Sequence, residues 1–139
     1  MKIKIEACDT WFSLVVRLKA NSTCEDCRCQ DRQMQCCHIW GRRAKSVRWS
    51  LDNAICMCSV CHRKHTENPI GFTAWIDGDL VGDKWVDGYL GRVHMKALNK
   101  KRNILMPTTK MLRKEIAKHY REEHKKMLAS ELYTPVTYN

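Results

Sequence analysis

Two Cys-x-x-Cys pairs, Cys24 with Cys27 and Cys58 with Cys61, are the clearest candidates for metal chemistry in the sequence. Each pair can bring two thiolates to one ion, and two pairs complete the tetrahedral coordination of a Cys₄ zinc site. Four thiolates leave no open position for a water, so we expect a structural Zn²⁺ that supplies folding energy. Of the other cysteines, Cys29, Cys36 and Cys56 remain alternatives for one zinc ligand, and these three and Cys8 are otherwise expected to be small buried apolar side chains.

Three further residues between and after these pairs are of types that could hydrolyse a phosphodiester: His38, Asn53 and His62. A histidine with a pKa near neutrality can take a proton from the attacking water, and a divalent ion can stabilise charge on the phosphate and leaving oxygen. Taken singly, each residue is more often structural, and an asparagine in a turn commonly satisfies backbone groups. Their order, and their position relative to both cysteine pairs, favours a catalytic interpretation.

The segments that contain them, residues 36–43, 48–53 and 61–65, resemble the HNH (ββα-metal) endonuclease superfamily. The resemblance implies that His38 is the general base at the end of a strand and that Asn53 braces the hairpin loop and orients it. It also implies that His62, on a short helix, binds a catalytic divalent metal, for which we expect Mg²⁺ or Mn²⁺.

The sequence departs from the superfamily at the residue before the expected base. That position is commonly Asp or His and helps to hold the metal, whereas here it is Cys37. A thiolate is a poor ligand for Mg²⁺, which prefers oxygen. The second metal ligand is therefore open among Cys37, His65 and Asp52.

A narrower similarity links residues 9–17, 48–53 and 67–69 and the C-terminal tail to phage recombination endonucleases of the NinG/Rap group. It implies activity on branched DNA, such as Holliday junctions or D-loops, with little sequence preference. A homodimer would suit junction resolution, because two strands must be cut. The implied setting is the cytoplasm of a bacterial cell, and the implied source is a phage gene.

The charge agrees with a nucleic-acid partner. The chain has 25 Lys and Arg against 15 Asp and Glu, a formal net charge of +10, which favours binding to a polyanion. No apolar run reaches the roughly 18 residues of a membrane span, and the N-terminal residues do not resemble a secretory signal. The expected DNA phosphate contacts are Arg42, Arg43, Lys45 and Arg48.

The residues that position these groups are expected to form an α+β fold. Helical spacing or capping predicts helices over residues 9–20, 59–66, 72–80, 85–97 and 107–128, and strands are predicted at 35–39 and 47–51. Residues 100–103 are predicted to be a loop and 133–139 a frayed end. We therefore predict an N-terminal helix and a zinc-stabilised ββα-metal core in residues 1–70. A helical extension in 71–139 would pack on the core or mediate dimerisation and DNA contacts.

Two other functions remain open. The cysteine pairs and the charge would equally suit a zinc-dependent nucleic-acid-binding protein without catalysis, for which Cys37 would mark a degenerate metal site. A protein that uses zinc only to fold would explain neither the charge nor the histidines.

Overall fold

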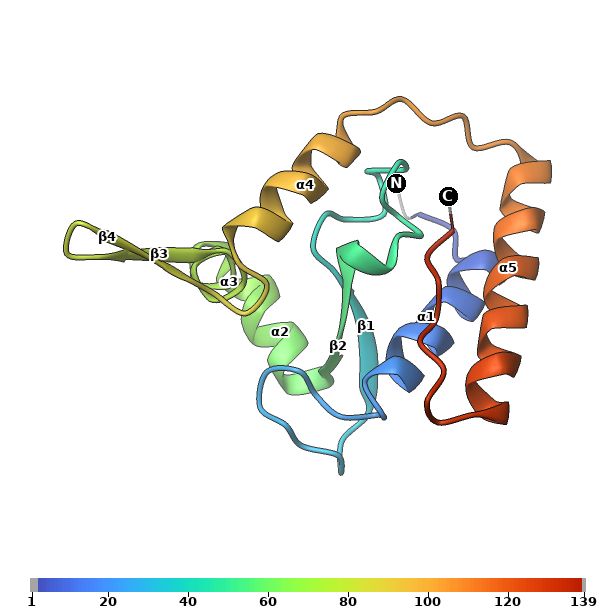
Figure 1. Ribbon diagram of the computed structural model, residues 1–139, viewed down its shortest axis with the longest axis horizontal. Helices are drawn as coiled ribbons and strands as arrows, with labels where there is room; N and C mark the ends of the chain where they lie inside the picture. The colour runs from blue at the N-terminus through green and yellow to red at the C-terminus, as the bar shows by residue number, and fades with distance from the viewer. Residues whose placement is uncertain (1–2, 139) are drawn as a thin grey trace.

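The computed structural model describes residues 3–138, and within them the chain is a mixed α+β protein, as the sequence predicts (Figure 1). The elements are α1 (Ala7–Lys19), β1 (Met34–His38), the 3₁₀ turn η1 (Leu51–Asn53), β2 (Ala54–Cys58), α2 (Ser59–Glu67), α3 (Pro69–Ile76), β3 (Gly78–Val81), β4 (Lys84–Asp87), α4 (Arg92–Arg102) and α5 (Lys110–Ala129). No helix in this part of the chain has the length and apolar character needed to cross a membrane.

At the centre, β1 and β2 form an antiparallel hairpin whose register pairs Met34 with Cys58 and His38 with Ala54. The helix α2 begins at the residue after β2, with Cys58 as its N-cap. Side chains alternate between the two faces of a strand. One face therefore contributes Cys56 to a core with α1 and α5, and the other contributes Cys37 to a core with α2 and α3.

The prediction of a second strand at residues 47–51 is wrong. Residues 47–50 form turns on the long connection between the strands, and the strand itself follows at 54–58. The apolar residues Val47 and Trp49 are buried, but tertiary packing buries them, and no ladder of backbone hydrogen bonds is formed there.

The helix α1 begins at Ala7, earlier than predicted, because Glu6 and Asp9 form a capping box. Its buried residues include Phe12 and Val15, and it packs against Ile116 and Tyr120 of α5. The helix α5 begins at Lys110, three residues later than predicted, with the Thr109 side chain accepting a hydrogen bond from the Leu112 amide. The last long helix therefore belongs to the same core as the first.

The C-terminal segment is packed on α5 rather than frayed, within the described residues. The Thr137 hydroxyl accepts a hydrogen bond from the Leu51 amide, and the Tyr138 amide donates to the Tyr120 hydroxyl. Glu123 of α5, which is buried, accepts from the Tyr133 hydroxyl at 2.5 Å. The prediction failed because these partners lie on elements remote in sequence.

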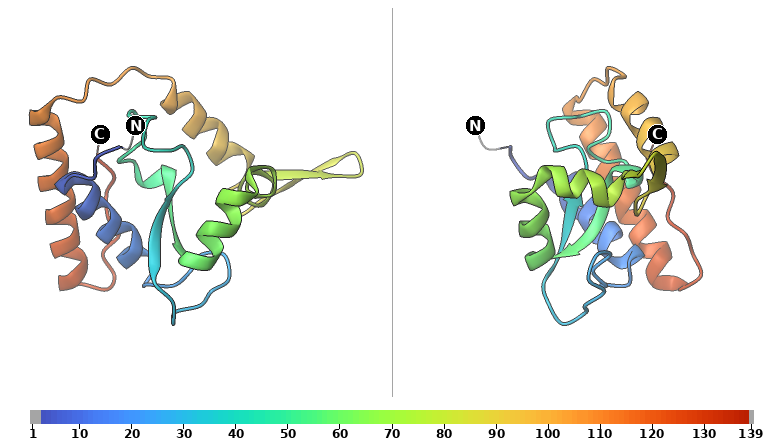
Figure 2. Two further views of the ribbon diagram at one scale, coloured as in Figure 1. Left: turned by 180° about the vertical axis from the view of Figure 1, so that it is seen from behind. Right: turned by 90° about the vertical axis from the view of Figure 1, so that its left-hand side faces the viewer.

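The extension predicted to be helical after residue 70 contains α4 and α5, but it also contains a β-hairpin that the prediction missed. The strands β3 and β4 form a hairpin that projects away from the rest of the protein (Figures 1 and 2). Gly82, with φ +67°, supplies the left-handed conformation of the turn between them. The helical spacing of Trp85 and later residues misled the prediction, and residues 100–102, predicted as a loop, complete α4.

Candidate nuclease and metal sites

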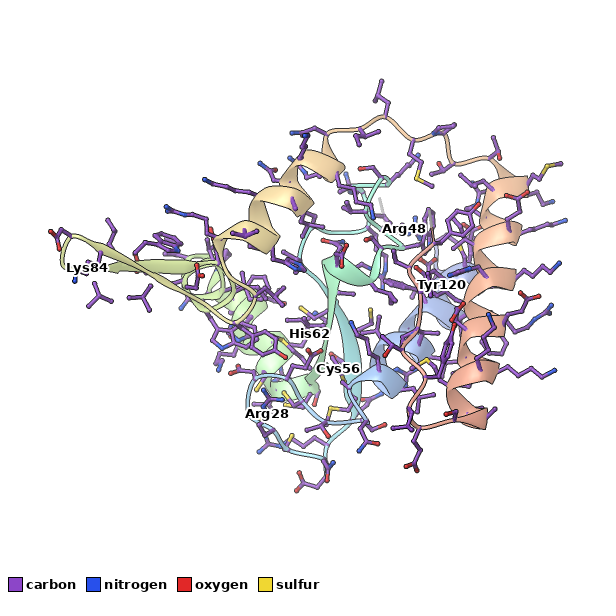
Figure 3. The ribbon with its side chains drawn as sticks, viewed as in Figure 1. Arg28, Arg48, Cys56, His62, Lys84 and Tyr120 are labelled. Carbon is purple, nitrogen blue, oxygen red and sulfur yellow. The ribbon has the colours of Figure 1, made fainter. Side chains whose placement is uncertain are left out.

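The structure brings together the four cysteines predicted to bind zinc. The Sγ atoms of Cys24, Cys27, Cys58 and Cys61 all lie within 4.8 Å of one another, close enough for one metal ion. The first pair lies on the loop between α1 and β1, and the second spans the end of β2 and the first turn of α2. In Figure 3, sulfur atoms gather beside the labelled Arg28 of this loop.

Backbone geometry prepares this cluster for a metal. Arg28, with φ +66°, turns the first loop so that its amide donates to the Cys24 carbonyl at 2.9 Å. Burial opposes ionisation of the Cys58 thiol, but hydrogen bonds from Cys61 and Arg32 outweigh it and lower the Cys58 pKa to about 6. Because a thiolate is the species that binds metal, this site suits a structural ion such as Zn²⁺.

His38 lies at the end of β1, and its ring contacts Phe12 of α1 edge-on at 5.7 Å. Its Nε2 lies 3.1 Å from the Arg48 carbonyl oxygen. A carbonyl only accepts, so Nε2 carries the hydrogen and Nδ1 keeps the basic lone pair. Burial, and then the positive charge of Arg42, lower the His38 pKa to about 4. The imidazole is therefore neutral at physiological pH, with Nδ1 able to accept a proton.

Asn53 is fully buried and holds the chain just beyond His38. Its Nδ2 donates to the Trp40 carbonyl at 2.9 Å, and its Oδ1 accepts from the Trp40 amide at 2.8 Å. The Asn53 carbonyl also accepts from the Ile39 amide at 2.8 Å. The start of the loop that follows the histidine is thus fixed through three hydrogen bonds to one residue.

His62 lies on α2 beside the β1–β2 hairpin (Figure 3). Its Nδ1 is 2.7 Å from Oε1 of Gln35 on β1. An amide oxygen accepts, so Nδ1 carries the hydrogen and Nε2 is left with the lone pair that a metal would need. Both residues line a shallow hollow of about 280 Å³. Sequence reasoning missed Gln35, although its place two residues before Cys37 puts both on the same strand face.

The candidates for a second metal ligand do not join His62. Cys37 is buried among apolar side chains, and burial, with the nearby charge of Glu25, raises its pKa to about 12. It is therefore a neutral thiol. Within residues 3–138, no group of three or more His, Cys, Asp or Glu ligand atoms includes His62.

The two other candidates have structural contacts instead. His65 lies 2.8 Å from Asp26 through Nε2 and stacks on the Trp75 ring at a centroid distance of 5.0 Å. Asp52 is exposed on η1, and its carbonyl lies 2.8 Å from Nε2 of His94. The His65 ring is thus directed at Asp26.

Arg48 was expected to contact DNA phosphates, and the structure contradicts this. Its side chain is only 8% exposed and makes two hydrogen bonds to the Asp9 carboxylate, at 2.8 and 3.0 Å. The Trp49 indole donates to the same carboxylate at 3.0 Å. Asp9 thus neutralises Arg48 inside the protein, where it links the loop to α1.

Arg42, by contrast, is close to both histidines. Its positive charge lowers the pKa of His38 and that of His62, after burial in each case. Its Nε atom is buried without a hydrogen-bond partner among the described residues. Arg43 and Lys45, also expected to contact phosphate, are exposed on the same loop. Positive charge therefore lies on the loop that follows His38.

Comparison with known proteins gives no match: no family model, no curated protein and no solved structure is significantly similar to this chain. The functional argument therefore rests on the residues and their geometry. The features that carry this argument are a hairpin followed directly by a helix, and a cysteine cluster at the base of the hairpin that could hold a metal ion. His38 ends β1, Arg42 lies on the loop after it, and His62 lies on α2.

Proposed function

We propose that this protein is a zinc-stabilised endonuclease that hydrolyses phosphodiester bonds in DNA, with His38 as the general base. The observation that carries the proposal is the hydrogen bond from His38 Nε2 to the Arg48 carbonyl. It fixes the ring and leaves Nδ1 as the basic nitrogen, the one that can take a proton from the attacking water.

In this mechanism Nδ1 of His38 takes a proton from a water whose oxygen attacks phosphorus. The bond between phosphorus and the leaving sugar oxygen breaks, and that oxygen takes up a proton from solvent. Arg42 supplies positive charge beside the phosphate, since its guanidinium influences both histidines. Asn53 keeps the loop after His38 in place, which holds the base in a productive position.

His62 Nε2, with the oriented Gln35 amide beside it, would hold a catalytic divalent ion. A single imidazole leaves the other positions of such an ion to waters and to the substrate phosphate, which Mg²⁺ and Mn²⁺ bind readily. When bound, such an ion supplies positive charge for the phosphate and leaving oxygen.

Branched DNA is the proposed substrate, on the strength of the resemblance of the sequence to the HNH superfamily and, within it, to the NinG/Rap group. The net charge of +10 supports sequence-independent contact with DNA backbones. A homodimer acting in a bacterial cytoplasm, from a phage gene, completes this proposal.

The second candidate is a zinc-dependent DNA-binding protein without catalysis. The observation that favours it is the apolar setting of Cys37, together with the absence of His62 from any group of three potential metal ligands among the described residues.

One experiment distinguishes the nuclease from the non-catalytic DNA-binding protein. Zinc-loaded protein is incubated with supercoiled plasmid and with a four-way junction, with and without added Mg²⁺ or Mn²⁺. Nicking that depends on the added ion, and that needs a higher ion concentration in His62→Ala, supports the nuclease. Junction cleavage faster than that of linear duplex supports the branched substrate. Tight binding of both DNAs with no cleavage under any ion would establish the second candidate.

A further inference from the structure

A groove of about 630 Å³ opens beside the segment that follows His38. One wall comes from residues 39–40 just beyond β1, and the others from α3 and α4. This volume lies in the range of sites that bind small organic molecules. The residues that give it its chemical character are Trp40, Phe72, Asp77, Arg92, Met95 and Lys96.

The groove combines aromatic surface with positive charge. Trp40 and Phe72 provide the aromatic surface, while Arg92 and Lys96 are exposed on α4 at the opposite wall. Arg102 lies over the Trp40 ring at 4.1 Å and adds a further positive charge nearby. Aromatic rings and cations together are the features by which proteins hold the bases and phosphates of single-stranded nucleic acid.

Two residues of the groove also have polar atoms that lack partners. The Trp40 Nε1 donor and the Asp77 Oδ1 acceptor are buried and make no hydrogen bond within the described residues. Most buried polar atoms in folded proteins are hydrogen-bonded, so each such exception calls for an explanation. Both atoms have almost no accessible surface, so a ligand reaches them only when the side chains turn toward the groove, where a nucleobase edge offers the acceptor and the donor that they lack.

We propose that this groove binds the base of an unpaired DNA nucleotide, with Trp40 and Phe72 as stacking surfaces and Arg92 and Lys96 at its phosphate. This inference rests on the proposed nucleic-acid function and specifies its substrate: DNA with an unpaired nucleotide near the cleaved bond. Trp40 is two residues from His38, so their Cα atoms are at most about 7 Å apart. Asn53 fixes the Trp40 backbone through the same two hydrogen bonds that hold the loop after the general base, His38.

The test compares two duplex probes by fluorescence anisotropy, using zinc-loaded protein without added Mg²⁺ or Mn²⁺. One probe has a single bulged deoxyadenosine, and the other has an abasic sugar at the same bulge. Stacking of one base is worth a factor of about ten in affinity, so wild type should bind the first probe about tenfold more tightly.

Blocking variants fill the groove from opposite walls. Thr73→Trp on α3 and Asn99→Trp on α4 place an indole in it at exposed positions, whereas Val93→Trp places one on α4 outside it, at a position 83% exposed. We expect both blocking variants to lose the preference for the base and Val93→Trp to keep it. Zinc content and circular dichroism verify that each variant is folded.

Equal affinity of wild type for the two probes would overturn the inference, as would a preference that survives in both blocking variants. Plasmid cleavage, measured separately with Mg²⁺, tests the proposed function independently. Base preference without cleavage would leave the groove assigned and refute the nuclease. Cleavage without base preference would refute the groove alone.

Discussion

Acidification from about pH 7.5 to about pH 5 should destabilise the protein through the buried imidazole of His38. The pKa of this group is about 4 in the folded protein, against 6.5 for the free side chain, because burial and Arg42 disfavour its charged form. The unfolded chain therefore gains a proton below about pH 6.5 that the folded protein does not take up until about pH 4. The contribution of His38 to the free energy of unfolding is therefore greatest above this pH window, and it is lost as the pH falls through the window.

The magnitude follows from the two pKa values. At about pH 5, linkage gives a loss of about 2 kcal/mol in the free energy of unfolding, relative to about pH 7.5. This is an upper value, because His38 is partly exposed to solvent. Other groups titrate in the same window, including His62, so the contribution of His38 must be isolated by comparison.

Urea unfolding of zinc-loaded wild type and of His38→Gln, each at about pH 7.5 and about pH 5, isolates the contribution of His38. Glutamine keeps a donor for the Arg48 carbonyl but does not titrate. We expect wild type to lose about 2 kcal/mol more than the variant on acidification. An equal loss in both proteins would show that the imidazole is not held neutral and would refute this reasoning. By the same argument, cleavage should keep its full rate down to about pH 6.

Three further perturbations test other parts of the structure. Cys58→Ser should abolish stoichiometric zinc binding and the cooperative unfolding transition, whereas Cys36→Ala should keep both. Metal analysis and circular dichroism measure the two properties, and full zinc content in Cys58→Ser would contradict the assigned cluster. Asp9→Asn should lower the free energy of unfolding in urea by about 3–5 kcal/mol, because it leaves the buried Arg48 unpaired. The exposed control Asp52→Asn should lower it by less than about 0.5 kcal/mol, and similar losses in the two variants would argue against a buried ion pair. Arg42→Gln should slow single-turnover cleavage about tenfold and move the acid limb of the pH profile to higher pH, since Arg42 lowers the His38 pKa. An unchanged rate, equal to that of the control Lys114→Gln at an exposed position on α5, would show that Arg42 is not part of the site.

The features predicted correctly from the sequence are those set by local spacing. The Cys-x-x-Cys pairs define a metal cluster because each turn is short, and the second pair is continuous with β2 and α2. Likewise, Thr109 caps α5 through a contact three residues away. In both cases the information lies within a few residues of the element that it determines.

The features that were missed depend on contacts remote in sequence. Arg48 cannot be recognised as buried without Asp9, which is 39 residues earlier. The C-terminal tail becomes ordered only because α5 and η1 offer hydrogen-bond partners. The groove beside Trp40 requires three separate segments, and neither periodicity nor composition indicates that they meet.

The most direct test of the central claim is the single-turnover rate of DNA cleavage in His38→Ala, compared with wild type and with His119→Ala. The control is matched, because the His119 imidazole also lies against a backbone carbonyl, that of Val136, but on α5. If His38 is the general base, its loss should lower the rate on the order of a hundredfold or more, with DNA affinity and zinc content unchanged. His119→Ala should cleave at nearly the wild-type rate. Cleavage by His38→Ala at the rate of His119→Ala would contradict the account.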